Sequence, residues 1–257
     1  MSRHLHILLL LVIGGALSAC GSGGGASATS TPGSGPTPAS SSAASPAPTV
    51  ASAAISINVP HAGASVRVPF EISGAANVFE AVLFVQVTGA DGRALCERRV
   101  QATSGTGTPG TWASVMAFPP PAAAAPVTIR AFSRSPRDGS EENAVTRSVQ
   151  VSAETPAIVI AEPRCNADIA QGAALAVNGT ARVFEATLMV ELRDATGTVV
   201  RTALVTADAG APDRGRWNTT LDLATVVAGA YDLVAYSISA RDGTPENIFA
   251  IPVRITV

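Results

Sequence analysis

The residues best suited to chemistry are the acidic and amide side chains of a short motif that the chain carries twice. The motif reads Arg-Asp-Gly-x-x-Glu-Asn, and its copies begin at Arg137 and Arg241. Carboxylate and amide oxygens suit a hard cation such as calcium. Asp and Gly also form turns, and an adjacent arginine cancels charge that calcium would need. A ligand site and a structural turn are both open, and we favour the turn. The motif residues are Arg137, Asp138, Gly139, Glu142, Asn143, Arg241, Asp242, Gly243, Glu246 and Asn247.

Other catalytic groups are scarce in this sequence. His61 is the only histidine after residue 20, and it lies in a predicted turn beside Pro60 and Gly63, where a solvated loop histidine is expected. One histidine and two scattered cysteines, Cys96 and Cys165, do not make a zinc site. No lysine is present for a Schiff base. We therefore expect no catalytic residue, no metal, no cofactor and no enzymatic activity.

Neither a glycine-rich motif nor the charge of the chain indicates a nucleotide or nucleic-acid ligand. Residues 105–110 match G-x-G-x-x-G, but a dinucleotide loop must open a helix, whereas Trp112 opens a predicted strand. The formal net charge is −2 and the arginines form no basic run. Nucleic acid is therefore not an expected partner.

The motif copies are 104 residues apart, which is the length of one small β-sandwich domain. The same offset, within one residue, relates Pro60 to Pro163 and Trp112 to Trp217. This spacing predicts a tandem duplication, with repeat 1 at residues 55–152 and repeat 2 at residues 157–257. Each repeat is long enough to bury its own core.

Within each repeat the apolar pattern has a period of two, which is typical of strands with one buried face. About seven short strands are expected in repeat 1, near residue 55 and at 66–73, 79–88, 93–102, 112–118, 126–134 and 144–151. The predicted buried face of one central strand carries Phe79, Ala81, Leu83, Val85 and Val87, and its counterpart carries Phe184, Ala186, Leu188, Val190 and Leu192. The sequence thus predicts an all-β protein of two tandem immunoglobulin-like β-sandwiches after a disordered linker.

Residues 1–20 have the pattern of a secretion signal. An apolar stretch too short to span a bilayer is followed by Leu-Ser-Ala-Cys ending at Cys20. These four residues resemble the lipobox of bacterial lipoproteins, which implies lipidation of Cys20 and an extracytoplasmic, membrane-anchored location; the alternative is an ordinary secreted protein. Residues 21–54 are Gly, Ser, Ala, Thr and Pro with almost nothing to bury, so a disordered tether is expected.

Several motifs together resemble a known family. They are Phe-Glu-Ala before a central strand, an Asp-Gly hairpin, Gly-x-Trp at Gly110 and Gly215, and the terminal Arg-Asp-Gly-x-x-Glu-Asn. They are similar to the immunoglobulin-like domain of bacterial spore germination, which often accompanies a GerM-type domain in envelope lipoproteins. The resemblance covers residues 55–257 and implies no established catalytic residues.

The sequence is compatible with two functions. The first is a structural or protein-interaction module of the cell envelope, bound to the membrane through lipid and to an unidentified envelope protein. The second is a carbohydrate-binding module that recognises cell-wall glycan such as peptidoglycan or capsule. Cys96 and Cys165 occupy non-equivalent places in the repeats, so we expect that folding does not need them and that they are free thiols. A disulfide between the repeats is the alternative.

Overall fold

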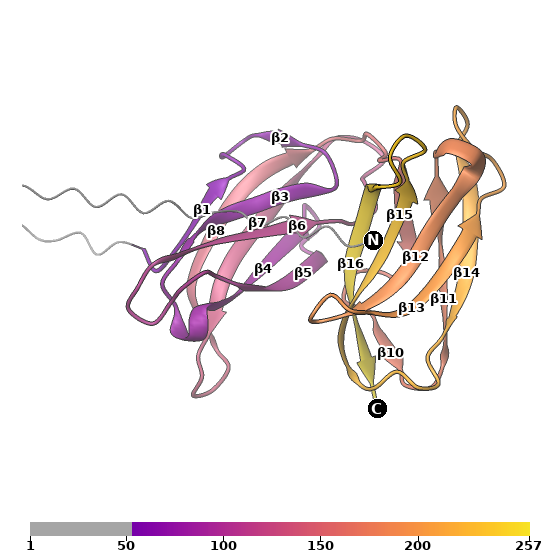
Figure 1. Ribbon diagram of the computed structural model, residues 1–257. Helices are drawn as coiled ribbons and strands as arrows, with labels where there is room; N and C mark the ends of the chain where they lie inside the picture. Colours follow the sequence, from indigo (N-terminus) through magenta and orange to yellow (C-terminus); the bar gives the residue numbers. More distant parts are fainter. Residues whose placement is uncertain (1–52) are drawn as a thin grey trace, which may run out of the picture. The chain divides into compact units, whose positions relative to one another are not determined.

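The computed structural model describes residues 53–257, which form strands and connecting turns (Figure 1). The predicted signal at residues 1–20, Cys20 and all but the last two residues of the linker at 21–54 lie outside this described part. No helix within residues 53–257 has the length and apolar character needed to cross a membrane. The all-β prediction is confirmed.

Repeat 1 is a sandwich of two sheets, drawn from indigo to pink in Figure 1. Its strands are β1 (Ile55–Val59), β2 (Ser65–Val66), β3 (Phe70–Ala76), β4 (Val82–Gly89), β5 (Ala94–Gln101), β6 (Gly110–Met116), β7 (Ala125–Arg134) and β8 (Glu141–Val151). One sheet has the order β1-β3-β6 and the other has the order β2-β8-β7-β4-β5. All pairings are antiparallel except that of β2 with β8.

Repeat 2 has the same topology, drawn from orange to yellow. Its strands are β9 (Ile158–Glu162), β10 (Asp168–Ala170), β11 (Ala174–Ala181), β12 (Thr187–Asp194), β13 (Val199–Thr206), β14 (Gly215–Asp222), β15 (Gly229–Ile238) and β16 (Pro245–Thr256). The sheets have the orders β9-β11-β14 and β10-β16-β15-β12-β13. Two tandem immunoglobulin-like sandwiches are therefore present, as predicted.

Each core lies between the two sheets of its own repeat. Leu83, Val85 and Val87 of β4 are fully buried, and the alternate residues of that strand are only partly buried. Trp112 and Trp217 come from the opposite sheets and are 3% and 2% exposed. The alternation that predicted these strands therefore reflects one face buried in the core and one face partly exposed to solvent.

The predicted strand at residues 66–73 is wrong in one respect, because it is two strands in different sheets. Short β2 pairs with β8, whereas β3 pairs with β1 and β6. Pro69 lies between β2 and β3 and has no backbone N–H to continue a ladder. The chain changes sheets here, and each repeat has eight strands instead of about seven.

The predicted burial of Phe79 and Phe184 is also wrong. These side chains are 55% and 65% exposed, because each begins a 3₁₀ turn, η1 (Phe79–Ala81) or η2 (Phe184–Ala186), and not the strand itself. The next two residues in each turn have positive φ, for example 53° at Glu80 and 58° at Ala81. This left-handed backbone breaks the period of two, so the buried alternation begins only after the turn.

Candidate functional site

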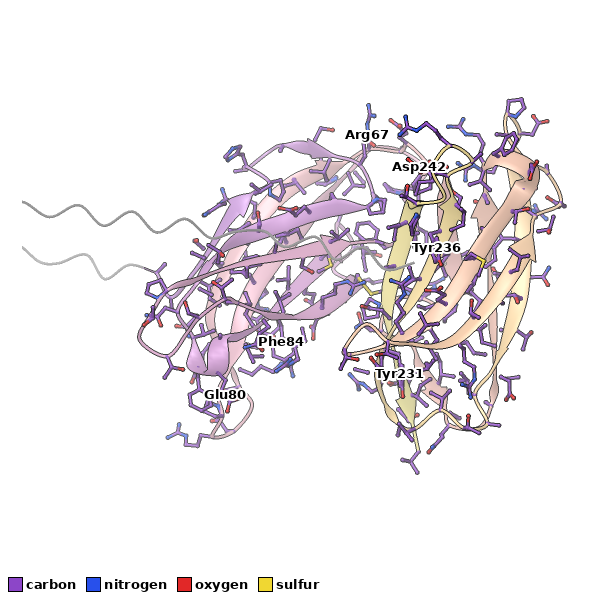
Figure 2. All side chains as sticks on the ribbon, viewed as in Figure 1. Arg67, Glu80, Phe84, Tyr231, Tyr236 and Asp242 are labelled. Atoms are coloured by element: carbon purple, nitrogen blue, oxygen red, sulfur yellow. A yellow bond between two sulfur atoms is a disulfide. The ribbon has the colours of Figure 1, made fainter. Side chains whose placement is uncertain are left out.

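The aspartates of the two motif loops are bound by their own turns. Asp138, between β7 and β8, accepts hydrogen bonds at Oδ1 from the backbone N–H and hydroxyl of Ser140, at 3.1 and 2.7 Å. Asp242, between β15 and β16 (Figure 2), accepts the same pair from Thr244 at 3.2 and 2.7 Å. One oxygen of each carboxylate therefore closes a local turn of the kind that aspartate favours.

The asparagines of the motif stabilise a bulge in the following strand. Asn143 and Asn247 have φ values of 57° and 55°, a conformation that asparagine tolerates better than most residues. Asn143 Nδ2 donates to Ser133 Oγ, and Asn247 Nδ2 donates to Ser237 Oγ, both at 2.9 Å. The ladders shift register at these serines. The amides therefore bond to the adjacent strand and not to an open loop.

The arginines and glutamates of the motif lie at the surface. Arg137 lies 4.0 Å from Asp138, and Arg241 lies 3.3 Å from Asp242. The Glu142 carbonyl accepts a hydrogen bond from Ser133, at 3.2 Å. Within residues 53–257 no three His, Cys, Asp or Glu side chains gather in a way that could hold a metal ion. The turn and the calcium site of the sequence analysis are therefore distinguished by the experiment given below.

Hydrogen bonds to the ionised carboxylates lower both aspartate pKa values. The side-chain and backbone donors of Thr244, followed by the hydroxyl of Ser239 and by Arg241, lower the pKa of Asp242 from 3.8 to about 2. Ser140, first through its hydroxyl and then through its N–H, lowers the pKa of Asp138. Because the folded pKa lies below the unfolded value, ionisation stabilises the fold above about pH 4, and this contribution is lost as the pH falls towards the folded pKa.

Asp138→Ala and Asp242→Ala are each expected to lower the melting temperature by a few degrees at pH 7, because they remove the acceptor that closes the turn. The difference between Asp242→Ala and wild type should shrink as the pH falls from about 4 towards 2, because the carboxylate protonates in the unfolded chain before it does in the folded one. Scanning calorimetry at several pH values measures both effects.

The matched control is Asp242→Asn, which keeps an oxygen acceptor and should cost less stability than alanine. Added calcium or chelator should leave the wild-type melting temperature unchanged. A calcium-dependent rise of several degrees that the alanine variants abolish would show that the loops are cation sites.

The outward faces of the central strands carry aromatic residues covered by arginine. Phe84 stacks on Phe132 with centroids 5.7 Å apart, and the Arg134 guanidinium lies 4.6 Å from the Phe84 ring centroid. In repeat 2, Tyr236 donates to Glu191 at 2.7 Å. Burial, and then this bond, raise the pKa of Tyr236. Neither repeat presents a bare aromatic platform on this face.

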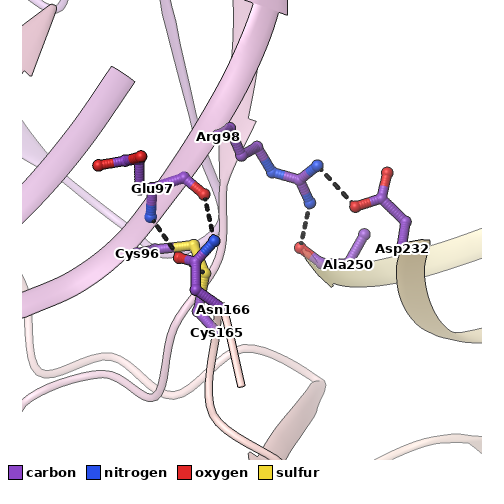
Figure 3. A network of polar contacts seen from close by, with 7 residues as sticks. All are labelled: Cys96, Glu97, Arg98, Cys165, Asn166, Asp232 and Ala250. Carbon is purple, nitrogen blue, oxygen red and sulfur yellow. Dashed lines mark hydrogen bonds and ion pairs between the residues drawn. A yellow bond between two sulfur atoms is a disulfide. The ribbon is translucent and has the colours of Figure 1, made fainter. Parts of the chain in front are cut away.

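The structure joins the repeats through Cys96 and Cys165, which form a disulfide (Figure 3). The expectation of free thiols is therefore wrong, and the alternative of an inter-repeat bridge is correct. Cys96 lies on edge strand β5, and Cys165 lies in the turn after β9. The two cysteines are non-equivalent because each repeat supplies one half of a single bond.

The other predicted residues are dispersed. His61 is exposed in the turn before β2, and residues 105–110 lead into strand β6 and not into a helix. Sequence reasoning missed Arg98 and Asn166, which form hydrogen bonds between the two repeats (Figure 3). The sequence does contain a signal for them: the equivalent positions of the other repeat hold different residue types.

The fold and loops define a class, that of tandem immunoglobulin-like β-sandwich proteins. The family model for the immunoglobulin-like domain of bacterial spore germination matches residues 54–140 and 157–244. Since these two matches cover more than half of the sequence, the chain belongs to this family. The resemblance drawn from the motifs is confirmed.

The chain is similar to several solved structures, at low sequence identity. The fibronectin(III)-like modules of Clostridium thermocellum CbhA are 16% identical, with 79% of this chain and 94% of theirs covered and a TM-score of 0.27. A BSP domain of a biofilm-associated protein is 17% identical, covering 78% and 29%, with a TM-score of 0.25. The ICAM-5 D1–D4 ectodomain fragment is 16% identical, covering 79% and 53%, with a TM-score of 0.28. No curated protein matches the sequence. At these TM-scores the structures carry no functional argument.

Proposed function

We propose that the protein is a non-catalytic interaction module of the bacterial cell envelope, anchored in the membrane by lipid on Cys20. The observation that carries the proposal is the tandem pair of immunoglobulin-like domains, each of a family named for bacterial spore germination. Two such sandwiches offer strands and loops as binding surface, and function in such folds resides in surface sites. The location is supported by the signal-like residues 1–20 and by the uncharged segment that follows them.

The arrangement of polar groups supports a role in binding and not in catalysis. The motif carboxylates accept hydrogen bonds from their own turns, and the motif amides hold the adjacent serines. His61, the histidine that could act as a general base, lies exposed in a turn. A general base needs a reacting partner within hydrogen-bond reach and a site that excludes water.

An envelope protein is the partner that we propose. Sugar-binding sites commonly use exposed aromatic rings, but Trp112 and Trp217 are buried in the cores. Phe79 and Phe184 are exposed, and exposed apolar side chains of this kind are also typical of protein contacts. The stacked Phe84 and Phe132 lie beneath Arg134. These observations support a protein ligand over a cell-wall glycan, which remains the second candidate from the sequence.

Co-sedimentation with protein-free cell wall separates the two candidates. The purified mature protein is expected to stay in the supernatant with wall material and to bind saturably to detergent-solubilised envelope proteins. The heat-unfolded protein serves as the control for non-specific adhesion. Saturable co-sedimentation of the folded protein with the wall, reversed by soluble wall fragments, would contradict the protein-partner proposal and favour the glycan module.

A further inference from the structure

Three consecutive residues of edge strand β5 bond across the seam between the repeats (Figure 3). Cys96 forms the disulfide with Cys165. Glu97 pairs through its backbone with the side chain of Asn166, and Arg98 reaches strands β15 and β16. A covalent bond is thus flanked by polar contacts on the same strand.

Asn166 acts towards β5 much as a neighbouring strand would. Its Oδ1 accepts the backbone N–H of Glu97 at 2.7 Å, and its Nδ2 donates to the Glu97 carbonyl at 2.9 Å. The amide therefore satisfies both backbone groups of one edge-strand residue, groups that would otherwise be open to another chain. This contact fixes the turn of repeat 2 against repeat 1 beside the disulfide.

Arg98 forms the third part of the seam. Its guanidinium donates to Asp232 Oδ1 and to the Ala250 carbonyl, each at 2.8 Å. The Arg98 side chain is only 16% exposed, compared with 42% for Asp232. A partly buried, charge-assisted pair is stronger than an exposed surface ion pair.

The residues that make these contacts are replaced at the equivalent positions of the other repeat. Strand pairing places Arg201 at the position of Cys96 and Ala203 at the position of Arg98, and it places Thr128 at that of Asp232. The turn of repeat 1 has Ala62 and Gly63 where repeat 2 has Cys165 and Asn166. The repeats fold alike without these side chains, so the sandwich itself does not require them. They serve the contact between the two repeats.

The connection between the repeats is held by arginines as well. Arg67 of repeat 1 lies 2.9 Å from Glu154. Arg214 of repeat 2 donates to the carbonyls of Thr155, Pro156 and Ala157. The Arg67 pair is exposed and therefore weak, and apart from the chain itself the disulfide is the covalent link between the described repeats.

We propose that Cys96, Cys165, Asn166, Arg98 and Asp232 form a redox-dependent clamp, which holds the repeats as one rigid unit when oxidised and releases them when reduced. Cys165 is half-buried and lies beside a hollow of about 500 Å³ that Arg93 and Arg164 also line, whereas Cys96 is 1% exposed. Cys165 is the more exposed of the two cysteines, so an attacking thiolate would approach there; the acidic Asp91 and Glu162 line the same hollow as the two arginines.

The reaction partner is a dithiol reductant. Its thiolate attacks the Cys165 sulfur, forms a mixed disulfide and displaces Cys96 as a thiolate, which takes up a proton. The second thiol of the reductant then breaks the mixed disulfide and frees Cys165. Two electrons pass to the protein disulfide, and the reductant leaves as its own disulfide. The clamp concerns the two repeats alone and does not depend on the identity of the envelope partner.

Nuclear magnetic resonance relaxation of the full mature chain tests the clamp. With the disulfide intact, amides of both repeats should report one rotational correlation time. After dithiothreitol, or in the Cys96→Ser/Cys165→Ser variant, each repeat should tumble separately with a value roughly half as large, because each holds about half of the folded residues. Mass spectrometry establishes the redox state of each sample.

Arg98→Ala and Arg99→Ala are the matched pair, since both remove one arginine from β5 but only Arg98 bonds across the seam. After reduction, Arg98→Ala should increase the separate motion further, and Arg99→Ala should behave as wild type. Free thiols in the non-reduced protein would overturn the proposal. So would a single unchanged correlation time after complete reduction, or loss of dispersed amide signals from either repeat, which would make the bond a requirement for folding.

Discussion

Gly74→Ala and Gly179→Ala are each expected to lower the free energy of unfolding by about 3 kcal/mol or more, the upper range for overpacking a well-packed site. A Cβ atom on Gly74 would lie 1.9 Å from the Ser56 carbonyl oxygen, and one on Gly179 would lie 1.9 Å from the Val159 carbonyl oxygen. These oxygens belong to neighbouring strand backbone, so a side-chain rotation cannot relieve the clash. The melting temperature should fall by about 6–12 °C for a unit of roughly 200 residues.

The tryptophan beside each glycine adds to this effect. The new Cβ would be 3.1 Å from Trp112 Cζ2 in repeat 1 and 2.7 Å from Trp217 Cζ2 in repeat 2. Both rings are buried and paired across the strands with these glycines. The tryptophan can occupy this part of the core because the facing residue has no side chain.

Thermal and denaturant unfolding measure the loss. Gly229→Ala is the matched control, because the nearest atom to its Cβ would be Tyr231 Cε2 at 3.6 Å, an ordinary contact distance. Its stability should stay within about 0.5 kcal/mol of wild type. Equal, small effects at Gly74, Gly179 and Gly229 would contradict the packing described for the two sandwiches.

Much of the fold can be predicted from local patterns in the sequence. The 104-residue spacing of the motif predicted the duplication, and the alternation through Leu83 to Val87 predicted a strand with one buried face. The Asp-Gly pairs predicted turns, and the structure places Asp138 and Asp242 in turns that their own carboxylates close. These features depend on residues close together in the chain, where sequence reasoning is strongest.

The errors arise where backbone geometry or distant pairing decides the outcome. Phe79 and Phe184 fit the apolar alternation, but left-handed residues after each of them turn the chain before the strand begins. No apolar pattern encodes that change. Phe79 and Phe184 are large and exposed at equivalent positions, so they also belong among the residues to test for partner contact.

The seam was missed for a different reason. Cys96 and Cys165 are 69 residues apart and come from different repeats. A comparison of equivalent positions therefore treats them as two unrelated cysteines and does not predict that they pair. Their non-equivalence argued against a bridge inside either repeat, which is correct, but not against a bridge between repeats. Closing a loop of that length stabilises a folded chain by about 4 kcal/mol in the chain-entropy treatment.

Cys20→Ala is expected to abolish lipid attachment and to release the protein from the membrane or block its processing. The reason is chemical: the thiol is the nucleophile to which the lipid is attached in the lipobox that residues 17–20 resemble, and alanine offers no nucleophile. Ser18→Ala is the matched control, since it keeps a small residue within the same four positions and should leave attachment unchanged.

Metabolic labelling with a fatty-acid analogue, followed by separation of membrane and soluble fractions, tests the central claim of a lipid-anchored envelope module most directly. The wild type and Ser18→Ala should carry label and partition with the membrane, and Cys20→Ala should carry none. Wild-type protein that stays with the membrane without label, or that appears unlabelled in the medium with the first 20 residues removed, would contradict the lipid anchor.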